Sequence, residues 1–255
     1  MIVDAKEFKE LKSLKTQVCI IGSGAAGIPL ALELANHYGD IVILESGSET
    51  LDAETQSLYS GVGTPEFYPD PISSRFRMLG GSCNFWHNNT SPLDPIDFEK
   101  RGWVPNSGWP FSYSTLEPFY NTAEKYCGVG DYDDQYSLDY WLEKAPFKDY
   151  FPDSELMKSA IIKSSLIPVR FFKQYGPDLL EDENVQIISG ANITEVDYSP
   201  ESENISGISF NTIKSIKHTI KAKLFIMCLG GIENARMLLN FNQDYDDRIG
   251  NLHGN

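Results

Sequence analysis

The chain has 255 residues, of which 41% are hydrophobic, enough for one large or two modest domains with a true core. Its formal net charge is −15, from 21 basic and 36 acidic residues, which argues against nucleic acid and anionic membrane surfaces as partners. No apolar run approaches the length of a membrane span.

The N-terminal segment alternates charged and apolar residues over positions 1–15, unlike a secretory signal. Within it, residues 5–14 show the pattern of an amphipathic surface helix. We therefore expect an N-terminal helix within residues 1–16 and a cytoplasmic location.

A strand–helix–strand unit is predicted next, over residues 17–45. Residues 18–21 form a short apolar run typical of a buried parallel strand, residues 28–37 indicate a helix, and residues 41–44 form a second apolar run. The second run ends directly on an acid, Glu45.

The turn between the first strand and the helix carries Gly22, Gly24 and Gly27 at the spacing Gly-x-Gly-x-x-Gly. The first glycine permits the tight turn, the second lets a pyrophosphate approach the backbone, and the third lets the helix pack on the sheet. The helix N-terminus then offers free N–H groups to phosphates. Glu45 is placed to accept hydrogen bonds from ribose hydroxyls and would repel a 2′-phosphate, so the pattern predicts a dinucleotide other than NADP.

The middle of the chain is less regular. Residues 46–112 are rich in turn residues but carry many aromatic side chains, a combination more typical of an ordered functional segment than of disorder. A capping box at Ser114–Glu117 predicts a helix that runs to Tyr126, and residues 153–164 are a further candidate helix.

From Asn184 the pattern becomes that of strands. Apolar or alternating runs at 185–188, 193–198, 205–213 and 217–223 predict a strand and a small antiparallel meander. Residues 224–229 are expected to form a separate buried strand, followed by a helix over 232–240.

Two further glycine turns could approach a ligand. One is Gly80-Gly81 within Arg77–His87, and the other is Gly230-Gly231 after the strand at 224–229. On spacing alone, an ordinary turn is an equal alternative for the first and the more common one for the second.

The four cysteines, Cys19, Cys83, Cys127 and Cys228, are far apart and form no Cys-x-x-Cys pair. We expect free thiols, buried at Cys19 and Cys228, rather than a disulfide framework or a zinc site.

Taken together, these stretches resemble the glucose–methanol–choline family of FAD-dependent oxidoreductases. The resemblance extends over residues 17–255, with the motifs in the family's order. It lies in the fingerprint with Leu44–Gly47, in Leu79–Trp86, in Ser91–Phe98 with Ser107–Phe111, and in Cys228–Leu239.

The resemblance implies an α/β fold, with an FAD/NAD(P)-binding Rossmann-like domain, a parallel sheet and a small antiparallel meander. It implies FAD as cofactor and oxidation of the CH–OH group of a small-molecule alcohol or sugar by hydride transfer to flavin N5. Some members bind the flavin covalently through a histidine in the glycine-pair segment; here Phe85 follows Asn84, so non-covalent FAD is expected.

The FAD-binding domain is expected to be discontinuous, comprising residues 17–128 and 180–255, with 129–179 as an insertion or the start of a substrate or cap region. The family's catalytic histidines lie in a C-terminal substrate domain that we expect to be missing, so no catalytic residue is assigned to His37, His87, His218 or His253. The residues expected to bind the cofactor are Gly22, Ser23, Gly24, Ala25, Ala26, Gly27, Glu45, Ser46, Gly80, Gly81, Ser82, Asn84, Ile193, Cys228 and Gly230.

Two alternatives stay open. An NAD-dependent Rossmann dehydrogenase fits the fingerprint, although the long aromatic segment and the antiparallel meander are unlike its alternating strands and helices. A catalytically inactive nucleotide-binding fragment is the other.

Overall fold

A computed structural model describes residues 1–61, 70–130, 137–144, 160–214 and 216–243. The chain divides into two compact units, one formed by residues 1–85 with 170–255 and the other by residues 86–169. The first unit therefore includes residues 170–179, which the sequence prediction placed in an insertion, and the second takes residues 86–128, which it placed in the FAD-binding domain.

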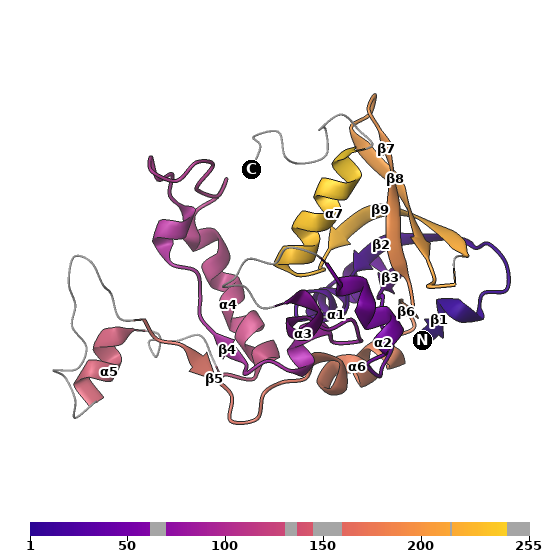
Figure 1. Ribbon diagram of the computed structural model, residues 1–255. Helices are drawn as coiled ribbons and strands as arrows, with labels where there is room; N and C mark the ends of the chain where they lie inside the picture. The colour runs from indigo at the N-terminus through magenta and orange to yellow at the C-terminus, as the bar shows by residue number, and fades with distance from the viewer. Residues whose placement is uncertain (62–69, 131–136, 145–159, 215, 244–255) are drawn as a thin grey trace. The chain divides into compact units, whose positions relative to one another are not determined.

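The first unit is built on a seven-stranded sheet in the order β1-β6-β3-β2-β9-β8-β7 (Figure 1). Five neighbouring strands, β1, β6, β3, β2 and β9, run parallel to one another. Strands β8 and β7 then extend the sheet beyond β9 as an antiparallel meander. This confirms the predicted α/β class with its added meander. The elements of this unit are β1 (Ile2–Asp4), the 3-10 helix η1 (Ala5–Glu7), β2 (Ser13–Ile21), α1 (Gly27–Tyr38), β3 (Ile41–Leu44), α2 (Ala53–Gln56), η2 (Ser57–Tyr59), α3 (Pro71–Ser74), η3 (Gly81–Asn84), α6 (Phe171–Glu181), β6 (Val185–Ser189), β7 (Asn192–Ser199), β8 (Asn204–Asn211), β9 (Lys217–Met227) and α7 (Gly231–Gln243).

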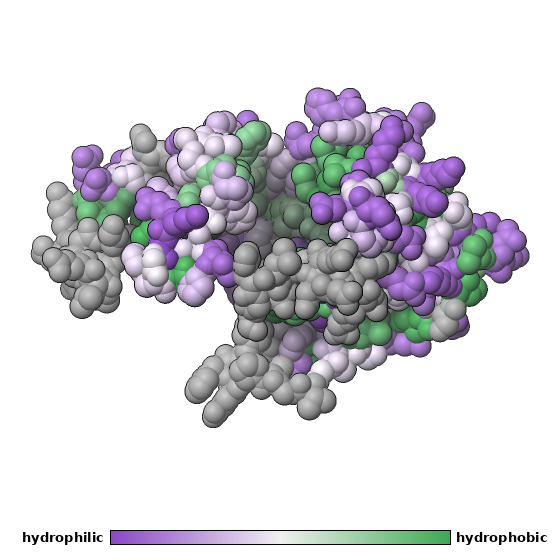
Figure 2. Space-filling view, turned by 90° about the horizontal axis from the view of Figure 1, so that it is seen from above, coloured by the Kyte–Doolittle hydropathy of each residue, from purple (hydrophilic) through white to green (hydrophobic). Residues whose placement is uncertain are grey.

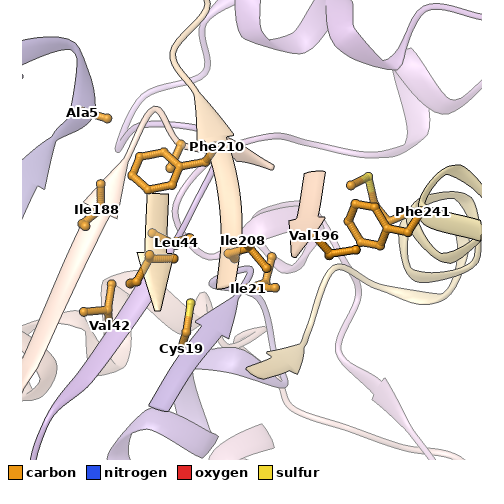
Figure 3. Packing of buried hydrophobic residues seen from close by; sticks show 13 residues of the cluster. Ala5, Cys19, Ile21, Val42, Leu44, Ile188, Val196, Ile208, Phe210 and Phe241 are labelled. Carbon is orange, nitrogen blue, oxygen red and sulfur yellow. The ribbon is translucent and has the colours of Figure 1, made fainter. Parts of the chain in front are cut away.

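The core of this unit joins the parallel strands to the meander. Its buried side chains include Cys19 of β2, Leu44 of β3, Ile188 of β6 and Phe210 of β8, which lie close together in Figure 3. Phe241 extends the cluster to α7, beside Val196. Every residue of β3 is buried, as the continuous apolar run predicts for a central parallel strand. Outside the core, hydrophilic residues make up much of this unit's surface in the view of Figure 2, as the strong net charge leads one to expect.

The predicted N-terminal helix is wrong. Residues 5–7 form a single 3-10 turn, while β1 pairs with β6, Ile2 opposite Ile187, and Ser13 already begins β2. The local amphipathic pattern is overridden because β1 and the early part of β2 gain ladder hydrogen bonds and burial from strands far away in the sequence.

The predicted separate strand at 224–229 is also wrong, because β9 runs without a break from Lys217 to Met227. Residues 217–220 of β9 pair antiparallel with β8, while residues 219–227 pair with β2 in parallel. Leu224 is 43% exposed, so this stretch is less buried than its composition suggests.

The second unit contains a long helix and a segment ordered by aromatic side chains. Phe98 lies within about 6 Å, centroid to centroid, of the rings of Trp109, Phe111 and Tyr113. This cluster includes three aromatic residues of the irregular segment, Phe98, Trp109 and Phe111. The elements are β4 (Asn89–Thr90), the 3-10 helix η4 (Pro95–Phe98), α4 (Tyr113–Cys127), α5 (Leu138–Lys144) and β5 (Lys163–Ser164).

The predicted helix at 114–126 is confirmed as α4, but it begins earlier, with Ser112 as N-cap, so the box at Ser114 does not cap it. The helix is tied to β5 by an ion pair of 3.2 Å between Glu124 and Lys163, both nearly buried. Residues 153–159 of the candidate helix at 153–164 lie outside the described residues. Its last two residues, Lys163 and Ser164, form β5 instead.

Candidate functional site

Three parallel strands end at the same level of the first unit's sheet. In the registers of β2 with its neighbours, Ile21 lies opposite both Leu44 of β3 and Met227 of β9. The next residues of the three strands are Gly22, Glu45 and Cys228, which therefore meet at one edge. In open α/β sheets, ligands bind in the crevice outside the carboxyl ends of the strands.

The turn between β2 and α1 has no room for side chains at two of its glycines. Gly22 has φ +100°, and a Cβ there would lie 2.6 Å from the carbonyl oxygen of Cys228. A Cβ on Gly27 would lie 1.9 Å from the carbonyl oxygen of Gly22. At Gly24, by contrast, a Cβ would meet no atom within 4 Å. The outer two glycines are therefore needed by the fold, while Gly24 leaves open space for a ligand.

The Glu45 carboxylate is buried, with 7% of the residue exposed, beside this turn. Its Oε2 accepts hydrogen bonds from the Ser23 N–H at 3.0 Å and the Ser23 hydroxyl at 2.7 Å. Its Oε1 accepts from the Gly47 N–H at 2.9 Å and the Ser46 hydroxyl at 3.3 Å. These four donors match the acceptor capacity of a carboxylate and hold the group in place.

The glycine pair packs against the opening turn. The Gly80 N–H donates to the carbonyl oxygen of Ser23 at 3.1 Å, and Gly80 has φ +87°. The Asn84 amide donates to the carbonyl oxygens of Leu79 and Gly81, at 2.8 and 3.0 Å. These two hydrogen bonds hold the loop of the glycine pair in shape.

A cavity of about 330 Å³ opens between these turns. Residues at the N-termini of α1 and α7 contribute to its lining, and helix N-termini carry N–H groups without helical partners. The predicted residues that line it are Gly22, Ser23, Gly24, Ala25, Ala26, Glu45, Ser46, Gly81, Ser82, Cys228 and Gly230.

Four predicted residues lie outside this cavity's lining: Gly27, Gly80, Asn84 and Ile193. Gly27 and Gly80 support the two turns instead. Ile193 lines a second cavity of about 240 Å³, whose lining also includes Gly22, Glu45 and Ser46. The two cavities therefore adjoin at the end of β3.

Sequence reasoning missed an ion-pair cluster at this junction. Arg77 and Glu233, each with 11% of its side chain exposed, line both cavities and are joined by a bond of 2.9 Å. Arg236 forms two further hydrogen bonds to the same carboxylate, at 2.9 and 2.7 Å. Tyr59, under the Arg77 guanidinium, also lines the first cavity, and its burial raises the pKa of the phenol. The position of Arg77 just before the glycine pair was the one local signal for this cluster.

Two cysteines form part of the cavity wall. Burial raises the pKa of the Cys83 thiol and raises that of Cys228 to about 11, so both are protonated at neutral pH and offer an uncharged wall. None of the four cysteines forms a disulfide, and Cys19 and Cys228 are buried, as predicted.

None of the three described histidines, His37, His87 and His218, is placed as a base. His218 is fully buried between the rings of Phe8 and Phe210, and its Nδ1 accepts from the Lys12 N–H at 3.1 Å. Burial lowers its pKa, so the ring is neutral and serves packing. His37 and His87 are exposed, and His253 lies outside the described residues.

The described residues contain neither a metal-binding cluster nor a membrane-spanning helix. No group of three or more histidine, cysteine or acidic side chains there could hold a metal ion. No described helix combines the length and hydrophobicity that crossing a bilayer requires.

The chain is similar in sequence to two curated oxidases over 128 aligned residues. It is 29% identical to 6'''-hydroxyparomomycin C oxidase of Streptomyces lividus and 30% identical to paromamine 6'-oxidase of Streptomyces fradiae. Each match covers 44% of this chain and 23% of the relative. No protein-family profile matches the chain.

The fold is similar to that of solved oxidases. A formate oxidase of Aspergillus oryzae RIB40, studied for its FAD modification, superposes with a TM-score of 0.58 at 16% identity, over 89% of this chain and 48% of that one. Pyridoxine 4-oxidase from Mesorbium loti superposes with a TM-score of 0.54 at 16% identity, over 86% of this chain and 50% of that one. The chain thus covers about half of each solved structure. Together, these matches confirm the predicted resemblance to the glucose–methanol–choline oxidoreductases.

Proposed function

Given this resemblance, we propose that the first unit is the FAD-binding domain of a glucose–methanol–choline-type oxidoreductase that oxidises the CH–OH group of an alcohol or sugar. The observation that carries the proposal is the meeting of Gly22, Glu45 and Cys228 at one sheet edge, beside a cavity that two helix N-termini line. The second unit, residues 86–169, includes most of the stretch 129–179, which we propose as an insertion or the start of a substrate or cap region.

The residues of the site fit FAD in a defined way. The open space at Gly24 and the N-termini of α1 and α7 suit a diphosphate. The adenosine ribose would bind at Glu45, where the Ser46 hydroxyl makes the longest of the four hydrogen bonds and is the donor that a ribose hydroxyl would replace. Ile193, in the adjoining cavity, is placed to contact the adenine.

The chemistry that FAD supplies is acceptance of a hydride at flavin N5 from the carbinol carbon. Phe85, directly after η3, offers no nucleophile for a covalent bond, which supports non-covalent binding. No described histidine lines either cavity, so we assign no general base to this chain. The free thiols support the further proposal of a cytoplasmic location.

Binding of FAD and NAD to the purified chain tests the proposal. We expect the protein to bind FAD, seen as a yellow colour that survives gel filtration and as a change in flavin fluorescence, and to show no saturable binding of NAD. Saturable NAD binding without FAD binding would instead support a Rossmann dehydrogenase. Reduction of the bound flavin by a panel of alcohols and sugars then separates an active protein from an inactive nucleotide-binding fragment.

A further inference from the structure

Arg77 occupies a position that the fingerprint does not explain. It precedes the glycine pair, and its side chain lines both the cavity at the opening turn and the adjoining cavity. Its backbone N–H is fixed by the side-chain oxygen of Gln56 at 3.1 Å, while the Gln56 amide nitrogen donates to the carbonyl oxygens of Ile72 and Arg75. The backbone of Arg77 is therefore fixed in position by hydrogen bonds with Gln56.

The guanidinium of Arg77 is positioned but only partly satisfied. One terminal nitrogen donates to Glu233 at 2.9 Å, and the group lies 4.2 Å from the centroid of the Tyr59 ring. Its Nε, however, is buried and has no hydrogen-bond partner among the described residues. Buried donors in native proteins are nearly always paired, because an unpaired one is costly, so the free N–H calls for an acceptor that binds in the cavity.

The charges of the cluster formed by Arg77, Glu233 and Arg236 indicate which kind of acceptor would bind. Arg77 and Arg236 share the carboxylate of Glu233, so two cations face one anion within the ion-pair cluster. Glu45, the other carboxylate that lines both cavities, is hydrogen-bonded to Ser23, Ser46 and Gly47 rather than to either arginine. The N-terminus of α1, with its partial positive charge, lines the same cavity as Arg77. Both features favour an anionic oxygen over a neutral one.

We propose that Arg77 is a ligand-binding residue whose Nε–H donates to a diphosphate oxygen of the bound dinucleotide, with Glu233 and Tyr59 positioning its guanidinium. This inference rests on the proposed function, since it names a further contact to the same ligand. It adds a side-chain cation to a diphosphate site otherwise built from backbone N–H groups.

The test compares Arg77→Met with Arg236→Met in the full chain, using ADP, adenosine and FAD as probes in calorimetric titrations. Each variant removes one of the two cations on Glu233 and leaves the other in place, so the buried carboxylate stays paired. Arg236 lines only the adjoining cavity, which makes Arg236→Met the matched control for a purely structural role of the ion pairs.

We expect Arg77→Met to weaken ADP and FAD binding by about tenfold or more and adenosine binding by less than about twofold. Arg236 lines the cavity proposed for adenine, so Arg236→Met is expected to change ADP and adenosine affinity by the same factor. Equal losses of ADP affinity relative to adenosine affinity in the two variants, equal losses of ADP and adenosine affinity in Arg77→Met, or no loss at all would overturn the inference. A wild-type chain that binds neither ADP nor FAD would instead refute the proposed function itself.

Arg77→Lys covers the case in which Arg77→Met does not fold, as judged by its thermal transition. Lysine keeps the charge beside Glu233 but cannot present a second N–H in the fork of a guanidinium. We expect ADP affinity to fall by about fivefold or more with adenosine affinity unchanged, and wild-type ADP affinity in this variant would contradict the role of Nε.

Discussion

Gly27→Ala is expected to unfold the first unit under conditions in which the wild-type chain is stable. The added Cβ would lie 1.9 Å from the carbonyl oxygen of Gly22, a rigid backbone atom, so α1 would have to move away from the turn. Overpacking typically costs about 1–3 kcal/mol, and a contact this short with rigid backbone is expected at the upper end of that range, a large part of the stability of a typical domain. Urea unfolding followed by circular dichroism measures the loss.

Gly24→Ala is the matched control for this substitution. It makes the same chemical change three residues earlier, where a Cβ meets no atom within 4 Å. Its urea midpoint is expected to equal or slightly exceed that of the wild type. An unchanged midpoint in Gly27→Ala would show that the close contact between α1 and the turn is not as described.

Glu45→Ala is expected both to destabilise the first unit and to remove FAD binding. The substitution leaves the N–H groups of Ser23 and Gly47 buried without their acceptor, at a cost of about 1–3 kcal/mol for each. It also removes the proposed acceptor for the ribose hydroxyls. Thermal unfolding and titration with FAD measure the two effects separately.

Glu49→Ala is the control for the loss of one acidic charge nearby, because Glu49 is exposed. It is expected to leave both stability and FAD affinity within experimental error of the wild type. Glu45→Gln retains one carbonyl acceptor, so its stability should lie between those of the wild type and Glu45→Ala. FAD affinity that is unaltered in Glu45→Ala would remove this residue from the ligand site.

The part of the fold that the sequence predicts well depends on local patterns. The β2–α1–β3 unit is encoded by two short apolar runs and a glycine spacing, all within residues 17–45, and the structure reproduces it. The meander is similarly readable, because its strands follow one another along the chain and alternate in hydrophobicity.

What the sequence did not predict depends on distant partners. The short strand β1 forms because it pairs with β6, with Ile2 opposite Ile187. Strand β9 is continuous because it pairs with β2 on one side and, at its start, with β8 on the other. The pairing of Arg77 with Glu233 likewise joins residues 156 positions apart. No periodicity within a short window contains such information.

The most direct test of the central claim, that a dinucleotide lies against the turn between β2 and α1, is FAD titration of the wild type and Gly24→Val side by side. A side chain at Gly24 would project into open space, so the variant should keep the wild-type unfolding temperature while blocking the approach of the diphosphate. We predict saturable FAD binding by the wild type and a loss of at least about tenfold in the variant. Equal FAD affinity in two equally stable proteins would contradict the claim.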